Sequence, residues 1–190
     1  MKVGIHGMGR LSLIVPTYSI NDSLTKMAVD CVKSYKNQVD EVVISEDSGI
    51  YREELYELAD IYVLHPNVGY SKNTNMAWKV ATGDFALVVN SDTTLQEGSL
   101  GDLCIANTVA SPLMIENSSH ASGNISGACF CVGRNIFQDG MFDEHTTVFN
   151  GADTVLFNNY WNRGVKSMVV STVKVVHISG TPGPSLRAHK

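Results

Sequence analysis

Short apolar runs alternate with amphipathic segments along the first half of the chain. We expect strands at the apolar runs, and helices where apolar residues recur every three or four positions. The expected strands are 11–15, 41–45, 61–64 and 85–89, and the expected helices are 23–35, 51–59 and 71–81. This alternation of strands and helices predicts a parallel sheet with right-handed crossovers.

Two of these helices carry local signals. Asp22 or Ser23 is the expected N-cap of the first helix, because a short polar side chain there accepts a free backbone N–H group. In the third helix, Met76, Ala77 and Val80 share one face and are expected to point into the core.

The second half of the chain is less regular. Residues 103–115 fit a helix or a strand, 128–132 and 165–178 have strand character, and 135–142 contain turn signals. Residues 153–163 predict a helix that ends at Gly164. We expect a flexible leader at 1–10, one domain at 11–180 and a C-terminal tail at 181–190. Gly4, Gly7 and Gly9 resemble a dinucleotide-binding turn, but that turn needs a helix directly after the glycines and here an expected strand follows. The pattern therefore favours a flexible leader over a dinucleotide-binding turn.

Composition limits the classes of function. The chain has 190 residues, 44% of them hydrophobic and 17% charged, which is typical of one globular domain. The net charge of −5 argues against a strong nucleic-acid surface. No apolar run is long enough to cross a bilayer, and residues 1–10 have no secretory apolar region. The four cysteines match no common zinc pattern and are expected to be reduced core thiols, which predicts a cytoplasmic protein.

Polar groups follow each strand of the first half. They are Thr17, the pair Glu46 and Asp47, the segment 67–69, and Asp92. The carboxyl ends of parallel strands meet at one edge of a sheet, where open α/β folds bind ligands. An oxygen ligand at Asp92 suits a hard divalent cation that holds a phosphate. Taken singly, these groups also fit loop carboxylates and helix caps.

Six segments, in this order, resemble the motifs of family 2 glycosyltransferases. They read LSLIVPTYS, EVVISEDSG, NVGYSKNTNMAWKVATGDFALVVNSDT, GMFDE, GADTVLFNNYWNRG and VKVVHISG. The resemblance covers residues 11–180 and implies a single α/β domain of GT-A fold, with a Rossmann-like, mostly parallel central sheet flanked by helices. It is nearest to the rhamnosyl- and galactofuranosyltransferase-like branch, in which the metal motif reads Asn-small-Asp-Thr.

The resemblance implies an inverting sugar transfer from a nucleotide-diphospho-sugar to an acceptor hydroxyl. The donor would be a UDP-, GDP- or dTDP-sugar, with Mn²⁺ or Mg²⁺ on its diphosphate. Asp153 would be the general base, Asp92 and His177 the metal ligands, and Gly127, Ala128 and Trp161 the acceptor side. The donor would contact Pro16, Thr17, Tyr18, Glu46, Asp47, Asn67, Gly69, Lys72, Asn73, Asn90, Ser91 and Asp92. The acceptor is not specified, and a partner subunit in a homo-oligomer is one way to complete its site.

Four positions depart from the family pattern and leave an alternative open. Asn90 replaces the first aspartate of the metal motif, Ala152 and Val155 replace acidic residues beside Asp153, and Asn159 replaces an arginine. A domain that binds a nucleotide sugar without transferring it is therefore the second hypothesis. A nucleotidyltransferase is disfavoured, because the segment PTYSINDS lacks the glycine and basic residues of a phosphate loop.

Overall fold

The computed structural model describes residues 9–116, 120–136, 141–145 and 151–178. The predicted tail and all but the last two residues of the predicted leader lie outside these ranges. The first half contains β1 (Leu11–Thr17), α1 (Asp22–Tyr35), η1 (Lys36–Gln38), β2 (Glu41–Glu46), α2 (Glu53–Tyr56), β3 (Ile61–Leu64), α3 (Tyr70–Val80) and β4 (Phe85–Val89). The second half contains β5 (Thr93–Glu97), η2 (Leu100–Leu103), β6 (Thr108–Glu116), β7 (His120–Ser122), β8 (Cys129–Gly133), η3 (Arg134–Ile136), α4 (Ala152–Asn162) and β9 (Lys166–His177).

The described strands form one sheet in the order β3-β2-β1-β4-β8-β6-β9-β5, with β7 also paired to β6. Strands β3, β2, β1 and β4 are parallel, as the sequence predicts. Strand β8 is antiparallel to β4 and β6, whereas β9 is parallel to β6 and antiparallel to β5. The α/β class is therefore confirmed, and the parallel first half is extended by a mixed second half.

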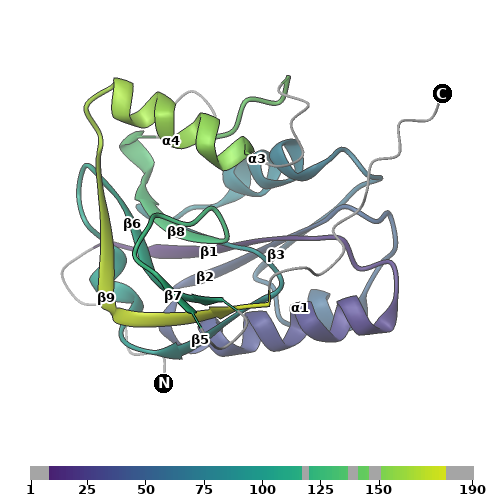
Figure 1. The fold of residues 1–190 in the computed structure, drawn as a ribbon. Coiled ribbons are helices and arrows are strands. Elements are labelled where there is room, and N and C mark those ends of the chain that lie inside the picture. Colours follow the sequence, from purple (N-terminus) through teal and green to yellow (C-terminus); the bar gives the residue numbers. More distant parts are fainter. Residues whose placement is uncertain (1–8, 117–119, 137–140, 146–150, 179–190) are drawn as a thin grey trace.

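Both faces of the sheet are covered. Helix α1 lies on one face, and helices α3 and α4 lie on the other (Figure 1). Alternate residues of a strand point to opposite faces, so Leu13 and Val15 join the core on the α1 side while Ile14 joins the core on the α3 and α4 side. This explains why the central strands have continuous apolar runs: each of their faces is buried.

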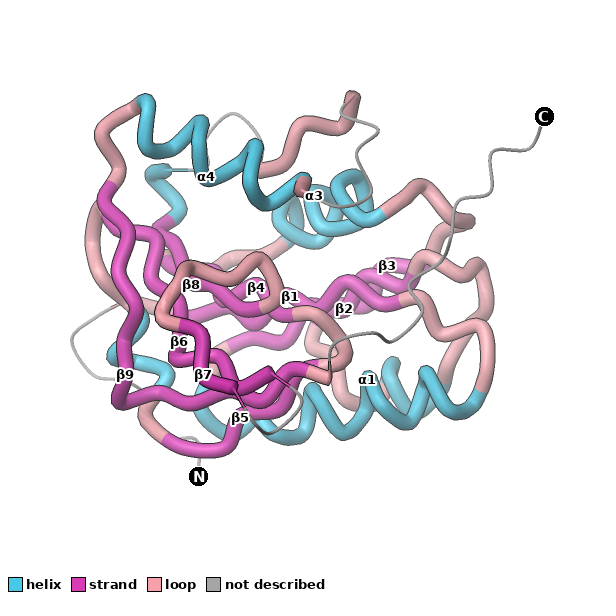
Figure 2. Tube along the Cα trace, in the orientation of Figure 1, coloured by secondary structure: helices cyan, strands magenta, loops and turns pink. Residues whose placement is uncertain are grey.

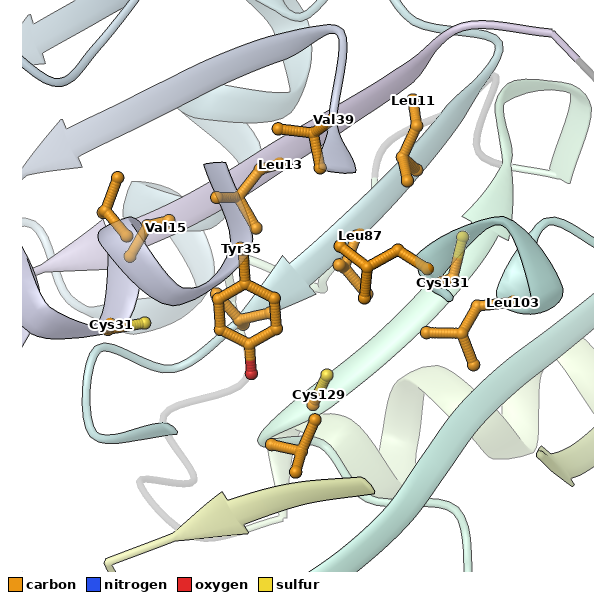
Figure 3. Packing of buried hydrophobic residues seen from close by; sticks show 14 of the residues in the cluster. Leu11, Leu13, Val15, Cys31, Tyr35, Val39, Leu87, Leu103, Cys129 and Cys131 are labelled. Atoms are coloured by element: carbon orange, nitrogen blue, oxygen red, sulfur yellow. The ribbon is translucent and has the colours of Figure 1, made fainter. Parts of the chain in front are cut away.

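The four cysteines lie in the core beside α1. All four are buried and free, which agrees with the prediction of reduced core thiols. Cys129 and Cys131 point to the same face of β8, as residues two apart in a strand must, and the hydroxyl end of Tyr35 lies near Cys129 (Figure 3). That hydroxyl donates to Thr93 Oγ1 at 3.1 Å, and so links α1 to β5.

Strand β9 bends sharply in its middle. Pro112 of β6 pairs with Val170, but the next residue, Leu113, pairs with Lys174, so three residues of β9 form the bend. The strand changes direction there (Figures 1 and 2). Gly98 packs against the bend with φ +102°, and a Cβ at this position would overlap the carbonyl oxygen of Thr172. After the bend, β9 runs beside β5 and ends with His177 opposite Thr93.

Several local predictions are corrected. The N-cap of α1 is Asn21, whose side-chain oxygen accepts from Leu24 N at 2.9 Å. The predicted helix 51–59 is reduced to the four residues of α2. On α3, Ala77 is buried as expected, but Val80 is 40% exposed. The ambiguous stretch 103–115 becomes the end of η2 followed by β6, and residues 137–140 of the predicted turn region lie outside the described residues.

The buried face of α3 is partly polar, because two of its side chains hold neighbouring backbone. Asn73 Nδ2 donates to the carbonyl oxygen of Thr17 at 3.3 Å. Asn75 accepts from Phe142 N at 2.8 Å and donates to Phe142 O at 2.9 Å. A hydrophobic pattern cannot reveal a helix face that is buried for hydrogen bonding. This explains why Val80 was wrongly expected to point into the core.

Candidate functional site

A cavity of about 530 Å³ opens where β1, β2 and β4 end, at the carboxyl edge of the parallel strands. The end of β9 and the start of α4 close its other side. Fourteen of the predicted site residues line it: Pro16, Thr17, Tyr18, Asp47, Asn67, Gly69, Asn73, Asn90, Ser91, Asp92, Gly127, Ala128, Asp153 and His177. Glu46, Lys72 and Trp161 are not among its lining residues.

At one end of the cavity, Asp47 holds the loop that follows β3. Its carboxylate accepts from Val68 N at 2.6 Å and from Gly69 N at 3.0 Å, and its Oδ1 lies 3.2 Å from His65 Nδ1. Burial raises the pKa of Asp47, and the two N–H groups offset part of that rise. Gly69 has φ +87°, a backbone conformation that favours glycine. Asp47 therefore shapes this end of the cavity as well as lining it.

Glu46 has a structural position instead of facing the cavity. Its Oε2 accepts from Thr17 Oγ1 at 2.8 Å, and its Oε1 accepts from Ser19 N and Ser48 N, each at 2.9 Å. The fully buried carboxylate thereby ties the loop after β1 to the loop after β2. Of the acidic pair predicted from the sequence, Asp47 is the member that lines the cavity.

Ser19 is a lining residue that the sequence did not suggest. Its side chain is buried, and its hydroxyl has no hydrogen-bond partner among the described residues. A buried hydroxyl without a partner is unfavourable, because it has lost its water without gaining a replacement. Its position in the cavity makes it suited to hydrogen-bond a ligand.

Asn90 and Tyr70 form a hydrogen-bonded pair among the residues that line the cavity. The hydroxyl of Tyr70 donates to Asn90 Oδ1 at 3.1 Å. With its oxygen occupied in this way, the Asn90 side chain keeps its NH₂ group as a donor. Burial, followed by the nearby carboxylates of Asp153 and Asp92, holds the pKa of Tyr70 well above its ordinary value, so the phenol stays protonated.

Asp92 and His177 meet across the cavity, together with a third residue, Glu116. The distance from Asp92 Oδ1 to His177 Nε2 is 3.4 Å. The other ring nitrogen, Nδ1, lies 3.0 Å from Glu116 Oε2 and 3.2 Å from Oε1. The hydrogen bond to Asp92 is the main cause that raises the pKa of His177 to about 9, against the opposing effect of burial.

The donor set at Asp92 and His177 fits a divalent cation. A carboxylate oxygen and an imidazole nitrogen are both ligands of Mn²⁺-type ions, and phosphate oxygens commonly complete such sites. Within the part of the chain that the structure describes, no three His, Cys, Asp or Glu side chains are grouped to hold an ion by themselves. A cation here would therefore need a bound small molecule, such as one with phosphate oxygens, to complete its coordination.

Asp153 lies in the first turn of α4 and packs directly against Gly127. A Cβ on Gly127 would overlap the Cβ, Cγ and Oδ2 atoms of Asp153. The preceding Gly151 has φ +109°, which lets the chain enter α4 from this side. Gly127 thus makes room for the Asp153 carboxylate, in addition to any room that it leaves for a ligand.

Two predicted residues lie elsewhere. Lys72 is exposed on α3, and the side chain of Trp161 is 47% exposed near the end of α4. Trp161 contacts Phe157 with a ring-centroid distance of 6.4 Å. Neither residue belongs to the cavity as the structure describes it.

The sequence missed Glu116, Tyr70 and Ser19. Glu116 directly follows the stretch 103–115, whose secondary structure was ambiguous, so nothing placed it beside His177, which is 61 residues away in the sequence. Tyr70 and Ser19 each stand next to predicted site residues, and this adjacency was the only signal available for them.

The sequence model described as "Glycosyl transferase family 2" matches residues 12–104, just under half of the chain. The comparison with curated proteins found no match to this chain. Among solved structures, GalNAc-T7 with UDP, GalNAc and Mn²⁺ is similar with a TM-score of 0.75 and 14% identity, over 91% of this chain and 44% of that one. S. aureus TarS, residues 1–349, is similar with a TM-score of 0.70 and 19% identity, over 89% of this chain and 60% of that one.

These similarities show the fold. The chain has the GT-A arrangement of the glycosyltransferases that it resembles, which confirms the fold class expected from the sequence. It spans about half the length of these two structures.

No helix among the described residues combines the length and apolar character needed to cross a bilayer.

Proposed function

We propose that this chain is a nucleotide-sugar-dependent glycosyltransferase of family 2 that inverts the configuration of the transferred sugar. One observation carries the proposal: a single cavity at the carboxyl edge of the parallel strands holds the Asp92–His177 pair and the Asp153 carboxylate. The Asp92–His177 pair is suited to bind a diphosphate with its cation, and Asp153 is suited to accept the proton of the attacking hydroxyl.

The donor binds with its nucleoside at the Asp47 end of the cavity. Pro16, Thr17 and Tyr18 border the base, and the buried Ser19 hydroxyl offers a hydrogen bond. UDP is the first nucleotide to test, because the similar GalNAc-T7 structure contains UDP. GDP- and dTDP-sugars are the other candidates, and the rhamnosyl- and galactofuranosyltransferase-like branch remains a prediction from the sequence.

Asp92 and His177 would hold Mn²⁺ or Mg²⁺ on the donor diphosphate. The bound cation would neutralise the negative charge that develops on the nucleoside diphosphate as it leaves. Asn90 adds no charge to this site, but its NH₂ group donates to an oxygen of the donor. With a single carboxylate and one imidazole, this chain depends on the diphosphate to complete the binding of the ion.

Asp153 is the general base of the proposed reaction. It accepts the proton of the acceptor hydroxyl as that oxygen attacks the anomeric carbon on the face opposite the leaving diphosphate. This geometry inverts the configuration of the sugar. Gly127 and Ala128 border the acceptor side, whereas Trp161 is exposed outside the cavity. The acceptor, a homo-oligomeric state and a cytoplasmic location stay predictions.

The test combines binding with turnover. Wild type, Asp153→Asn and Asp102→Asn are incubated with UDP-sugars and Mn²⁺, and UDP release is measured with and without candidate acceptor sugars. Asp102 is an exposed aspartate outside the cavity that accepts from Thr172, so it serves as a matched control. We expect turnover by wild type and Asp102→Asn, and a loss of at least about 100-fold in Asp153→Asn.

Thermal unfolding with UDP and Mn²⁺ distinguishes binding from catalysis. A ligand at 100 times its dissociation constant stabilises the folded chain by about 2.7 kcal/mol, so all three variants should show a raised Tm. Full turnover by Asp153→Asn would contradict the role of this residue. Binding by wild type without turnover of any donor would favour the second hypothesis, a nucleotide-sugar-binding domain.

A further inference from the structure

Glu116 is the last residue of β6, and the sheet places it directly beside His177. The two residues are partners in the parallel register of β6 and β9, so their side chains leave the same face of the sheet. The carboxylate contacts His177 Nδ1 through both oxygens, at 3.0 and 3.2 Å. Since a carboxylate only accepts, the Nδ1–H group of His177 donates to Glu116.

This hydrogen bond determines which ring nitrogen faces the cavity ligand. When a cation replaces the proton on Nε2, the ring keeps its proton on Nδ1 and offers the ion its lone pair on Nε2, the nitrogen that lies 3.4 Å from Asp92 Oδ1. The bond also fixes the rotation of the ring. Asp92 and the lone pair of His177 are thereby directed at the same place, although they belong to segments that are far apart in the sequence.

We propose that Glu116 is a positioning residue for the divalent-cation site and acts through His177. The inference rests on the proposed function, in which Asp92 and His177 hold the cation. It assigns to Glu116 the selection of the His177 tautomer and the orientation of its ring. A carboxylate on the outer nitrogen of a ligating histidine also makes the other nitrogen more basic, which strengthens its bond to a metal.

Glu116 acts from behind the ring instead of joining Asp92 as a ligand. It binds Nδ1, whereas Asp92 faces Nε2, so the imidazole lies between the two carboxylates. In agreement, no group of three metal-ligating side chains is found among the described residues. If Glu116 were a direct ligand, the Mn²⁺ affinity of a variant lacking both Glu116 and His177 would differ from the affinity expected if Glu116 only positions His177.

A neighbouring pair shows what an ordinary surface contact looks like on these strands. Glu97 of β5 pairs with Lys174 of β9 at 2.7 Å, and its side chain is 63% exposed. The side chains of Glu116 and His177 are 33% and 18% exposed, and both residues line the cavity. Glu97→Ala is therefore a matched control that removes a carboxylate from a β9 contact outside the cavity.

The experiment measures Mn²⁺ affinity directly, by the electron paramagnetic resonance signal of free Mn²⁺ during titration of the full chain with and without UDP. Wild type is compared with Glu116→Ala, Glu116→Gln and Glu97→Ala, and thermal unfolding without metal checks that each variant folds. We expect Glu116→Ala to weaken Mn²⁺ binding by about 10- to 100-fold. Glu116→Gln, which still accepts from Nδ1–H, should fall between wild type and alanine, and Glu97→Ala should match wild type.

A double-mutant cycle separates positioning from ligation. If Glu116 acts through His177, Glu116→Ala has no further effect on Mn²⁺ affinity once His177→Ala is present. Additive losses in the double variant would overturn the proposal and make Glu116 a ligand in its own right. Unchanged affinity in a folded Glu116→Ala variant would also overturn it while leaving the proposed function intact. Absence of Mn²⁺ binding by wild type, with and without UDP, would contradict the cation site itself.

Discussion

The position of the Asp153 carboxylate depends on the absence of a side chain at residue 127. Gly127 and Asp153 are in such close contact that a methyl group on the glycine would occupy the space of the carboxylate. The family resemblance assigns Gly127 to the acceptor side of the site. In the fold, the group that occupies the space beside Gly127 is the carboxylate of Asp153, the proposed base. Its position is therefore sensitive to a single added methyl group.

We predict that Gly127→Ala displaces Asp153 and lowers the rate of sugar transfer by about 100-fold, the size of effect expected from moving a catalytic group by about 1 Å. Binding of UDP with Mn²⁺ should change little, since Asp92 and His177 are not in this contact. Turnover and ligand-induced shifts in Tm measure the two effects. Gly123→Ala is the control, because a Cβ there meets nothing within 4 Å. Wild-type turnover by Gly127→Ala would contradict the steric argument.

At the scale of elements, α3 is held by hydrogen bonds as well as by apolar packing. Asn75 satisfies both backbone groups of Phe142, and its Nδ2 also donates to Glu144 Oε1 at 3.0 Å. The ring of Phe142 packs edge-on against Tyr70, which lines the cavity, with a centroid distance of 5.4 Å. Helix α3 therefore connects the segment 141–145 to the candidate site.

We predict that Asn75→Ala lowers the free energy of unfolding by about 2 to 4 kcal/mol, because two buried backbone groups lose their partner. Urea unfolding measures this, with Lys72→Ala as the control from the exposed side of the same helix. A loss below about 0.5 kcal/mol in Asn75→Ala would show that water replaces the side chain without cost.

Glu41 joins three elements at the opposite end of the sheet. From the first residue of β2, it accepts from Ser12 of β1 and from the backbone and hydroxyl of Thr82, in the loop before β4. Burial alone would raise the pKa of Glu41, but these hydrogen bonds outweigh it and lower the pKa below the ordinary value of 4.5. The folded state therefore favours the ionised carboxyl.

A pKa that is lowered on folding stabilises the chain above the unfolded-state pKa, and this stability is lost as the pH falls through the folded-state value. We predict that wild type exceeds Glu41→Gln in stability at neutral pH and that the difference shrinks as the pH falls below 4.5. Urea unfolding across this range tests the prediction, with Glu54→Gln on α2 as an exposed control. A difference that grows on acidification would reverse the sign and refute it.

The elements differ in how well the sequence predicted them, and the cause is the range of the interactions that determine each. The bounds of β3 and the place of β4 follow from local apolar runs. The buried face of α3 and the role of Glu116 depend on segments that are distant in sequence, and no local pattern encodes them. Asp92 was found from its place after an apolar strand, and His177 and Asp153 were found through the family resemblance, whereas their mutual geometry required the fold.

For the whole molecule, the sheet separates two apolar cores, and the four thiols belong to the one beside α1. Burial raises the pKa of Cys31 to about 12, so its reactive thiolate form is scarce at neutral pH.

We predict that Ellman's reagent reacts slowly with the native chain and titrates four thiols in guanidinium chloride. Free cysteine under the same conditions gives the reference rate. A native thiol that reacts as fast as free cysteine would mean that this core opens readily.

The bend in β9 gives the site an order of completion. Most of the cavity's lining residues fall between positions 16 and 92, whereas His177 is contributed by the end of β9, beside Thr93. During synthesis on the ribosome, these residues emerge first, and Asp92 meets His177 only once β9 has joined the sheet. In the proposed function, a charged donor is therefore retained only after β9 has docked.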